Sequence, residues 1–401
     1  MVFSSETPLA SCESHPSVLG EDHIAQWKNV GAMDNTAVKQ YHPRIERLKE
    51  KLAEKGLNGV ILVPGPNLQY YTGGHSFLLE RPFFMAIPVE GDPHLVAPTL
   101  EAGPYLRCPL KIIIHKWSDS EGPSKAILEA ATDLDWIGKW GLEGIMPYGF
   151  LDALLKNVEP QFENADPILQ GIRSVKDPQE LKMLTRSANI LSKAFLEIPS
   201  MLEAGTSEIE LSQRISHEIY SNGAESAPDV LVQSGPMAAD GHHIPSARKL
   251  KRKESIVVDA TCTYGGYFAD ITRTFILGKD NRFERLYETL LCAQIAAKEA
   301  ARAGVTVGFV DSAARTLLQE RNLEGYFVHR TGHGLGLEVH EEPYIVQGGT
   351  EQLRPSMAFT IEPGVYMRGK TGLRIEDDLI AGKKTSVVLS KSVPNEYGWW
   401  N

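Results

Sequence analysis

Apolar side chains recur at helical spacing in two long stretches of the chain. After Pro43, one apolar stripe predicts a helix that Gly56 can end, and this stripe consists of Ile45, Leu48 and Leu52. Between about residues 281 and 303, apolar positions fall at i, i+3, i+4, i+7 and i+8 before Gly304; they are Phe283, Leu286, Tyr287, Leu290 and Leu291. Packing on a core explains this second stripe fully.

Two short patterns mark helix starts by their capping chemistry. In Asp177-Pro178-Gln179-Glu180, a capping aspartate precedes a first-turn proline, and a glutamate follows at the spacing of a capping box. Ser207 and Glu210 have the same spacing. We expect a long helix from the first pattern, and we expect it to open a second domain.

Short apolar runs bounded by turn residues predict strands. Residues 59–63 form a continuous apolar run, which indicates a buried strand. The runs 83–89 and 94–97 flank Glu90-Gly91-Asp92 and predict a hairpin. Further strand candidates are residues 111–115 and 140–142, the second preceded by a helical stretch. Strands that alternate with helices indicate an α/β domain.

These patterns divide the chain into three parts. Residues 1–38 are polar and lack clear periodicity, so we expect an N-terminal arm or a short helix. Residues 39–170 contain the predicted α/β domain. Residues 171–401 contain the second domain, in which helices are interspersed with strand-rich segments.

Composition and charge narrow the class of protein. With 401 residues, 42% hydrophobic and 23% charged, the chain has the make-up of a soluble globular protein of about two domains. A formal charge of −10 argues against nucleic-acid binding, which needs a basic face. No apolar run is long enough to span a membrane, and the N-terminus lacks a secretory pattern. The 4 cysteines have no CxxC spacing, so we expect a cytoplasmic location.

Two pairs of acidic residues lie on predicted hairpins in the last third of the chain. Asp259 and Asp270 flank Tyr264-Gly265-Gly266-Tyr267, and either possible two-residue turn keeps both carboxylates on one face. Whether the two carboxylates lie directly opposite or diagonally across the hairpin, their charges repel unless a cation lies between them. Arg273 points to the other face by alternation, so a metal ion is the better answer.

Glu362 and Glu376 form the second pair. Their midpoint is Gly369, so an odd-length loop or a bulge would bring both side chains to the same face. His333 lies between the two pairs in the glycine-rich segment 329–341, where small neighbours let the backbone approach closely.

Together, these five residues predict a site for two divalent metal ions. Magnesium, calcium and manganese favour the carboxylate oxygens, whereas the imidazole favours manganese, iron, cobalt or zinc. His340 is a better candidate for a substrate-facing donor than for a ligand, and the loop histidines His242 and His243 are a second source of such a donor.

Four segments resemble the metal-dependent creatinase and methionine aminopeptidase superfamily, peptidase family M24. They are Asp259–Phe275, His329–Glu341, Thr360–Tyr366 and Gly372–Glu376. The two-domain layout resembles Xaa-Pro dipeptidases (prolidases) and aminopeptidase P over roughly residues 40–395. The resemblance implies an α/β (α+β) fold class, with a creatinase-like α/β domain at 39–170, a pita-bread catalytic domain at 171–401, and a homodimer.

The resemblance also implies a role for each site residue. Asp259 chelates one metal ion, His333 and Glu362 hold the other, and Asp270 and Glu376 bridge the two around a water or hydroxide. Manganese is expected, with cobalt, iron or zinc as alternatives. Glu362 passes a proton from the water to the leaving amine, His242 and His340 support the oxyanion, and Arg374 steadies Glu376 or the substrate.

These roles imply hydrolysis of the Xaa-Pro bond at the N-terminus of dipeptides or short peptides. Some positions depart from the family pattern at the rim of the site: Met237, Asp240-Gly241, Ala260-Thr261 and Arg330. They leave two alternatives open. One is a metal-dependent lyase or amidohydrolase of the same superfamily acting on a non-peptide molecule, and the other is a non-catalytic binding protein.

Overall fold

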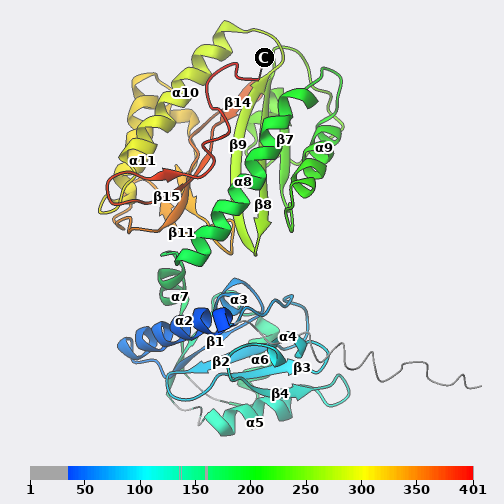
Figure 1. The fold of residues 1–401 in the computed structure, drawn as a ribbon, viewed down its shortest axis with the longest axis vertical. Coiled ribbons are helices and arrows are strands. Elements are labelled where there is room, and N and C mark those ends of the chain that lie inside the picture. The colour runs from blue at the N-terminus through cyan, green and yellow to red at the C-terminus, as the bar shows by residue number, and fades with distance from the viewer. Residues whose placement is uncertain (1–34, 135, 137, 159–160, 401) are drawn as a thin grey trace, which may run out of the picture.

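The computed structural model describes residues 35–134, 136, 138–158 and 161–400. Figure 1 shows an N-terminal and a C-terminal body, joined through α7 (Asp166–Arg173) and α8 (Pro178–Met201). None of the helices in these ranges is long and apolar enough to cross a membrane.

The N-terminal body is a mixed sheet covered by helices. Its strands run in the order β4-β3-β2-β1-β5-β6. They are β1 (Gly59–Leu62), β2 (Phe84–Pro88), β3 (His94–Pro98), β4 (Ile113–Trp117), β5 (Lys139–Leu142) and β6 (Gln161–Asn164). The helices are α2 (Asn35–Glu54), α3 (Pro66–Thr72), α4 (Gly103–Leu106), α5 (Ser124–Leu134) and α6 (Tyr148–Leu155). The predicted hairpin is confirmed, because β2 and β3 pair in antiparallel fashion.

The first helix begins earlier than expected. Pro43 lies inside α2 rather than before it, and α2 takes in residues 35–38 of the predicted arm. The stripe Ile45, Leu48 and Leu52 is buried, and this packing keeps the helix continuous across a proline that removes one backbone hydrogen bond. Residues 1–34 of the arm lie outside the described residues. The predicted boundary at residue 170 falls within α7 and stays a prediction.

The C-terminal body places curved sheets between two pairs of helices. The sheets have the orders β7-β8-β9, β11-β10-β12-β15-β16 and β13-β14. Helices α8 and α9 (Glu208–Ser221) lie on one side and α10 (Asn281–Ala300) and α11 (Val307–Glu320) on the other (Figure 1). The strands are β7 (Val230–Ser234), β8 (Ser255–Tyr264), β9 (Tyr267–Ile276), β10 (Gly332–Gly334), β11 (Glu341–Ile345), β12 (Ala358–Ile361), β13 (Gly364–Met367), β14 (Thr371–Arg374), β15 (Asp377–Ile380) and β16 (Val387–Val388).

Both predicted capping boxes are present. Asp177 accepts hydrogen bonds from the N–H groups of Gln179 and Glu180 at 2.8 and 2.9 Å, and Glu180 accepts one from the N–H of Asp177 at 2.9 Å. Ser207 and Glu210 form the same reciprocal pair at the start of α9. Because side chains satisfy the first free N–H groups, these two helix starts could be read from the sequence.

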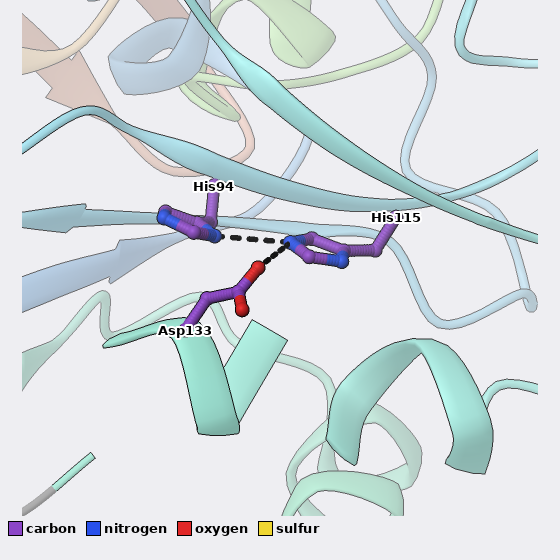
Figure 2. Close-up of side chains that lie close together, drawn as sticks. All are labelled: His94, His115 and Asp133. Carbon is purple, nitrogen blue, oxygen red and sulfur yellow. Dashed lines mark hydrogen bonds and ion pairs between the residues drawn. The ribbon is translucent and has the colours of Figure 1, made fainter. Parts of the chain in front are cut away.

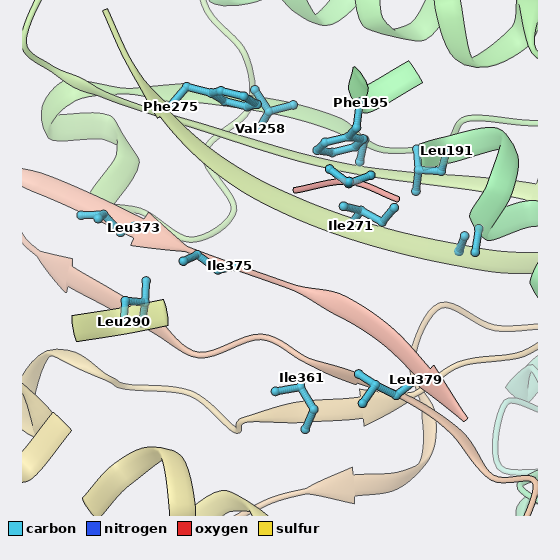
Figure 3. Close-up of a cluster of buried hydrophobic side chains, with 14 of the residues drawn as sticks. Leu191, Phe195, Val258, Ile271, Phe275, Leu290, Ile361, Leu373, Ile375 and Leu379 are labelled. Carbon is cyan, nitrogen blue, oxygen red and sulfur yellow. The ribbon is translucent and has the colours of Figure 1, made fainter. Parts of the chain in front are cut away.

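The C-terminal core holds the helices against the strands that position the site. Figure 3 shows Leu191 and Phe195 of α8 near Ile271 of β9, with Leu290 of α10 on the opposite side beside the C-terminal strands. All of these side chains are at most 1% exposed. Helix α10 ends at Ala300, before the predicted 303, because the backbone at Ala301 turns to an extended conformation.

Candidate metal centre

One pocket of about 1200 Å³ opens in the C-terminal body. The side chains that line it include every ligand and donor implied by the resemblance, namely Asp259, Asp270, His333, Glu362, Glu376, His242, His340 and Arg374. Segments more than a hundred residues apart in the sequence therefore meet at one place. Their geometry limits what the pocket can do.

The β8–β9 hairpin brings the first acidic pair together diagonally. Tyr264 pairs with Tyr267 around the turn Gly265-Gly266, so Thr261 lies opposite Asp270 and Thr272 lies opposite Asp259. Of the two turns considered, the structure contains the diagonal one, which still places both carboxylates on one face of the ribbon. Positive φ angles at both turn glycines, 60° and 77°, suit this tight connection.

An odd-length loop, one of the two connections expected from the sequence, joins the two strands that lie between Glu362 and Glu376 in the chain. Met367 pairs with Thr371, so residues 368–370 form a three-residue loop centred on Gly369, where φ is 72°. In the same register Gly364 pairs with Arg374. Continuing this register past the ladder places Glu362 opposite Glu376 on the same face. Glu376 also joins β9, because its N–H donates to the carbonyl of Thr272 at 3.0 Å.

His333 faces the acids from β10. Its Nε2 lies 3.5 Å from Glu362, 3.8 Å from Asp270 and 3.9 Å from Glu376. Its Nδ1 lies 3.1 Å from the carbonyl oxygen of Gly334, so a proton on Nδ1 leaves the Nε2 lone pair directed at the acids. Burial, and then the neighbouring His340, lowers the pKa of His333, which favours the neutral ligand form.

The flanking glycines allow this close packing. A Cβ atom at Gly332 would lie 1.9 Å from the carbonyl oxygen of Thr360, and one at Gly334 would lie 2.3 Å from that of Glu342. Any larger residue at either position would push β10 away from its neighbours. The predicted reason for a glycine-rich frame around His333 is therefore confirmed.

Two carboxylate oxygens at the centre are buried and have no hydrogen-bond partner among the described residues. They are Asp270 Oδ1 and Glu376 Oε1. Burial and the charges of neighbouring acids raise the pKa of Asp270 and of Glu376 well above the ordinary carboxyl range. Uncompensated buried acids are costly, whereas divalent cations would satisfy these oxygens and neutralise the repulsion. The donor set of carboxylates and one imidazole thus fits such cations.

Arg374 forms an ion pair with Asp259. Its guanidinium donates to the carboxylate of Asp259 and, at 2.8 Å, to the hydroxyl of Tyr366. The sequence predicts that Arg374 steadies Glu376 or the substrate, and this role stays a prediction; the Glu376 carboxylate accepts a hydrogen bond from Thr272 Oγ1 at 2.6 Å. Asp259 is thus already paired, whereas Asp270, Glu362 and Glu376 form no ion pair with Arg or Lys within the described ranges.

The two loop histidines, His242 and His243, have different surroundings. His242 lines the pocket, whereas His243 lies 3.3 Å from the buried Glu208 and does not line it. His340 also lines the pocket, and its ring meets that of His333 edge to face at a centroid distance of 4.2 Å. Among the rim departures, Asp240, Gly241 and Arg330 line the pocket. Met237 does not, and it is 39% exposed.

Several contributing residues were not found from the sequence. Thr272 bonds both Glu376 and, at 3.2 Å, Arg374 Nε, and its place two residues after Asp270 on the same strand face could have revealed it. Tyr366 links Arg374 to His329, whose Nε2 lies 2.9 Å from the tyrosine hydroxyl. Asp378 accepts a hydrogen bond from the N–H of Asp270 at 3.1 Å. No sequence pattern marked these last contacts.

A buried ionic cluster connects the interdomain segment to the pocket wall. Arg173 donates to Asn67 of the N-terminal body at 2.9 Å and also contacts the carboxylate of Glu341. Lys176 contacts the same carboxylate. Since Glu341 directly follows His340, this cluster ties the position of a pocket histidine to both bodies.

Buried carboxylates gathered around the neutral imidazole of His333, on sheets enclosed by helix pairs, define the class of a divalent-metal enzyme. The chain belongs to metallopeptidase family M24: the model of that family matches residues 182–383, and the creatinase/prolidase N-terminal domain matches residues 44–175. The expected fold, a creatinase-type N-terminal domain followed by a pita-bread domain, is confirmed. The protein is a peptidase, and peptidases of this family use divalent metal ions.

Named relatives and solved structures agree with this membership. The chain is 36% identical to a probable dipeptidase PepE of Mycobacterium tuberculosis, over 89% of this chain and 96% of the relative. It is 32% identical to an Xaa-Pro dipeptidase of Pyrococcus horikoshii, over 87% and 97%. A prolidase structure from Thermococcus sibiricus superposes with a TM-score of 0.82 at 35% identity, covering 90% of this chain and 97% of that one.

Proposed function

We propose that this protein is a dinuclear metal-dependent dipeptidase that hydrolyses the Xaa-Pro bond at the N-terminus of dipeptides or short peptides. The observation that carries the proposal is the pair of buried oxygens, Asp270 Oδ1 and Glu376 Oε1, that lack partners among the described residues beside a neutral His333. Similarity to Xaa-Pro dipeptidases supports the choice of substrate.

The five predicted ligands would hold two divalent cations, with manganese as the expected metal and cobalt, iron or zinc as alternatives. Asp270, His333 and Glu376 support this assignment most directly, because one ligand atom from each lies within 4.8 Å of the others. When bound, such cations act as Lewis acids and lower the pKa of a coordinated water. Asp259 contributes the carboxylate that Arg374 already holds in place.

The chain's own side chains would move the proton and orient the peptide. Burial raises the pKa of Glu362, so its carboxylate can accept a proton from water and deliver it to the leaving nitrogen. His242 and His340 line the pocket and can donate hydrogen bonds to the scissile carbonyl oxygen as negative charge develops on it. Arg374 acts indirectly, as a positioning residue, by holding Asp259.

Arg330 supports a short substrate. Its guanidinium lines the pocket and lies 4.3 Å from the ring centroid of Tyr344. Within the described part of the chain it forms no ion pair with a carboxylate. Its charge is therefore free to meet the terminal carboxylate of a dipeptide, since arginine binds carboxylates with a planar pair of donors.

Hydrolysis of Xaa-Pro dipeptides by the manganese-loaded protein tests the proposal. Proline should be released, and metal content should approach two ions per chain. Inactivity toward every Xaa-Pro peptide, combined with turnover of a non-peptide amide, would favour the lyase or amidohydrolase alternative. Replacement of Arg330 by methionine should raise KM for a dipeptide about tenfold or more and leave a C-terminally amidated substrate unaffected. A homodimer and a cytoplasmic location stay predictions.

A further inference from the structure

A second group of possible metal ligands lies in the N-terminal body. His94 on β3 and His115 on β4 belong to neighbouring parallel strands, in which His94 pairs with Ile113 and Val96 pairs with His115. This register places the two histidines diagonally on the same face of the sheet. Figure 2 shows both rings directed toward one another, with Asp133 of α5 reaching the same point.

Three ligand atoms converge in this group. His94 Nδ1 lies 2.9 Å from His115 Nε2, and the same Nε2 lies 3.9 Å from Asp133 Oδ2. All three atoms lie within 4.8 Å of one another. Atoms bound to one zinc ion at about 2.0–2.2 Å are themselves about 3–4 Å apart, so small side-chain movements would let all three atoms reach a shared ion.

Both rings are buried in the N-terminal body. His94 is 4% exposed and His115 is 7% exposed. A neutral imidazole carries one proton, and a bond of His94 Nδ1 to a metal leaves that proton on Nε2. Without an ion, the two facing nitrogens can share only one proton between them.

We propose that His94, His115 and Asp133 bind one divalent transition-metal ion, with zinc as the probe. Two imidazoles and one carboxylate suit zinc and similar borderline ions better than magnesium or calcium. The site is separate from the catalytic pocket, because β4 is the edge strand of the N-terminal sheet and α5 lies at the end of that body away from the C-terminal body (Figure 1).

Glu129 is placed where it could support His115 as a metal ligand. It stands one helical turn before Asp133 on α5, and its carboxylate lies 3.9 Å from His115 Nδ1. A proton on Nδ1 facing this carboxylate directs the lone pair of Nε2 toward the ion. Glu129 also pairs with Lys125 at 3.8 Å, which keeps it on this side of the helix.

The ion would join the edge of the sheet to the helix that covers it. A shallow depression lined by His115, Glu129 and Asp133 opens to solvent beside the group. Solvent can therefore complete the coordination shell, and the ion can enter without opening the fold. Because the ligands come from β3, β4 and α5, binding would stabilise this part of the N-terminal body against unfolding.

Zinc binding to the full-length chain after removal of all metal tests the proposal. The wild-type protein should bind one zinc ion more per chain than Asp133→Asn, a replacement at a half-exposed position that leaves both buried histidines in place. Asp152→Asn, which changes a partly exposed carboxylate on α6, is the matched control and should bind as the wild type does. Glu129→Gln should weaken this zinc about 10- to 100-fold, the usual effect of losing a supporting carboxylate.

A second experiment excludes zinc that binds in the catalytic pocket. In an Asp270→Asn, Glu376→Gln background, one zinc per chain should remain, and adding Asp133→Asn should remove it. Zinc should also raise the melting temperature of this background protein, but not after Asp133 is replaced. Equal zinc content and equal affinity with and without Asp133→Asn would overturn the proposal and leave the two histidines as a hydrogen-bonded pair.

Discussion

Arg374 donates a hydrogen bond to Asp259, although the two residues lie 115 positions apart in the chain. Both side chains are mostly buried, at 4% and 18% exposure. The protein thus neutralises one acid of the pocket with a permanent positive charge. No arginine or lysine among the described residues pairs with the other three acids, Asp270, Glu362 and Glu376. Their negative charges must therefore be neutralised in another way, by bound cations or by protonation.

Replacing Arg374 with methionine should destabilise the metal-free protein. Loss of the guanidinium leaves Asp259 buried without a counter-charge, which costs about 3–5 kcal/mol. Divalent cations should then restore more stability than they add to the wild type, because they would also neutralise Asp259. Urea unfolding with chelator and with manganese measures both effects. The matched control is Arg368→Met, an exposed arginine of the same pocket, and equal behaviour of the two variants would contradict the assignment.

Glu362→Gln should separate proton transfer from metal binding. The amide can still offer an oxygen, but it cannot accept a proton from water, so kcat should fall by about 10²–10⁴ while much of the metal is retained. Turnover of an Xaa-Pro dipeptide and metal content together check this expectation. The control is Glu320→Gln on the exposed face of α11, and full activity of Glu362→Gln would show that another group moves the proton.

Glu376→Gln should have opposite effects with and without metal. In chelator, removal of one of several crowded buried acids should stabilise the protein on the order of 1–3 kcal/mol. With manganese, the variant should lose most of the metal-induced rise in melting temperature, because Glu376 Oε1 would no longer be a ligand. The matched control is Glu299→Gln, an exposed position of α10. A variant that is less stable in chelator would argue against repulsion between these acids.

Arg173→Gln should impair both stability and catalysis. The wild-type guanidinium links Asn67 to Glu341, and the variant leaves Glu341 with Lys176 alone. Loss of one partner of a buried ion pair costs about 3–5 kcal/mol. Because Glu341 adjoins His340, we also expect kcat/KM to fall about tenfold. Arg354→Gln is the control, since the side chain of this exposed arginine bonds Ser174 and the carbonyl of Gly171 in the same interdomain segment and does not contact Glu341. Unchanged kcat/KM would restrict the cluster to a structural role.

Glu143 should make the stability of the N-terminal body depend on pH. Burial raises its pKa to about 7, although Val63 and Asn67 donate hydrogen bonds to it. The unfolded chain ionises this carboxyl near its ordinary pKa, while the folded chain keeps it protonated to about pH 7. The contribution of Glu143 to the free energy of unfolding is therefore fully present below about pH 4.5 and is lost as pH rises to about 7. At 1.36 kcal/mol per pH unit, the loss amounts to about 3 kcal/mol at most.

Unfolding of wild type and Glu143→Gln in chelator, at pH 5 and at pH 8, isolates this effect. The wild type should lose more stability than the variant over this interval, because glutamine does not ionise. Glu163→Gln on β6 is a matched, half-exposed control in the same body. Parallel pH profiles for wild type and Glu143→Gln would show that Glu143 is already ionised at pH 5.

The sequence by itself determined the local elements and the residue types of the candidate metal centre. The capping boxes at Asp177 and Ser207, the β2–β3 hairpin and the odd loop around Gly369 could be predicted because neighbours in the chain decide them. The acidic pairs could be placed on common faces because side chains alternate along a strand.

Only the tertiary structure decided which distant side chains meet. Arg374 pairs with Asp259, and α2 continues across Pro43. The ionic cluster of Arg173 and the group of His94, His115 and Asp133 were likewise hidden in the sequence. Local periodicity specifies the face on which a residue lies, whereas its partner depends on how separate sheets and helices pack against one another.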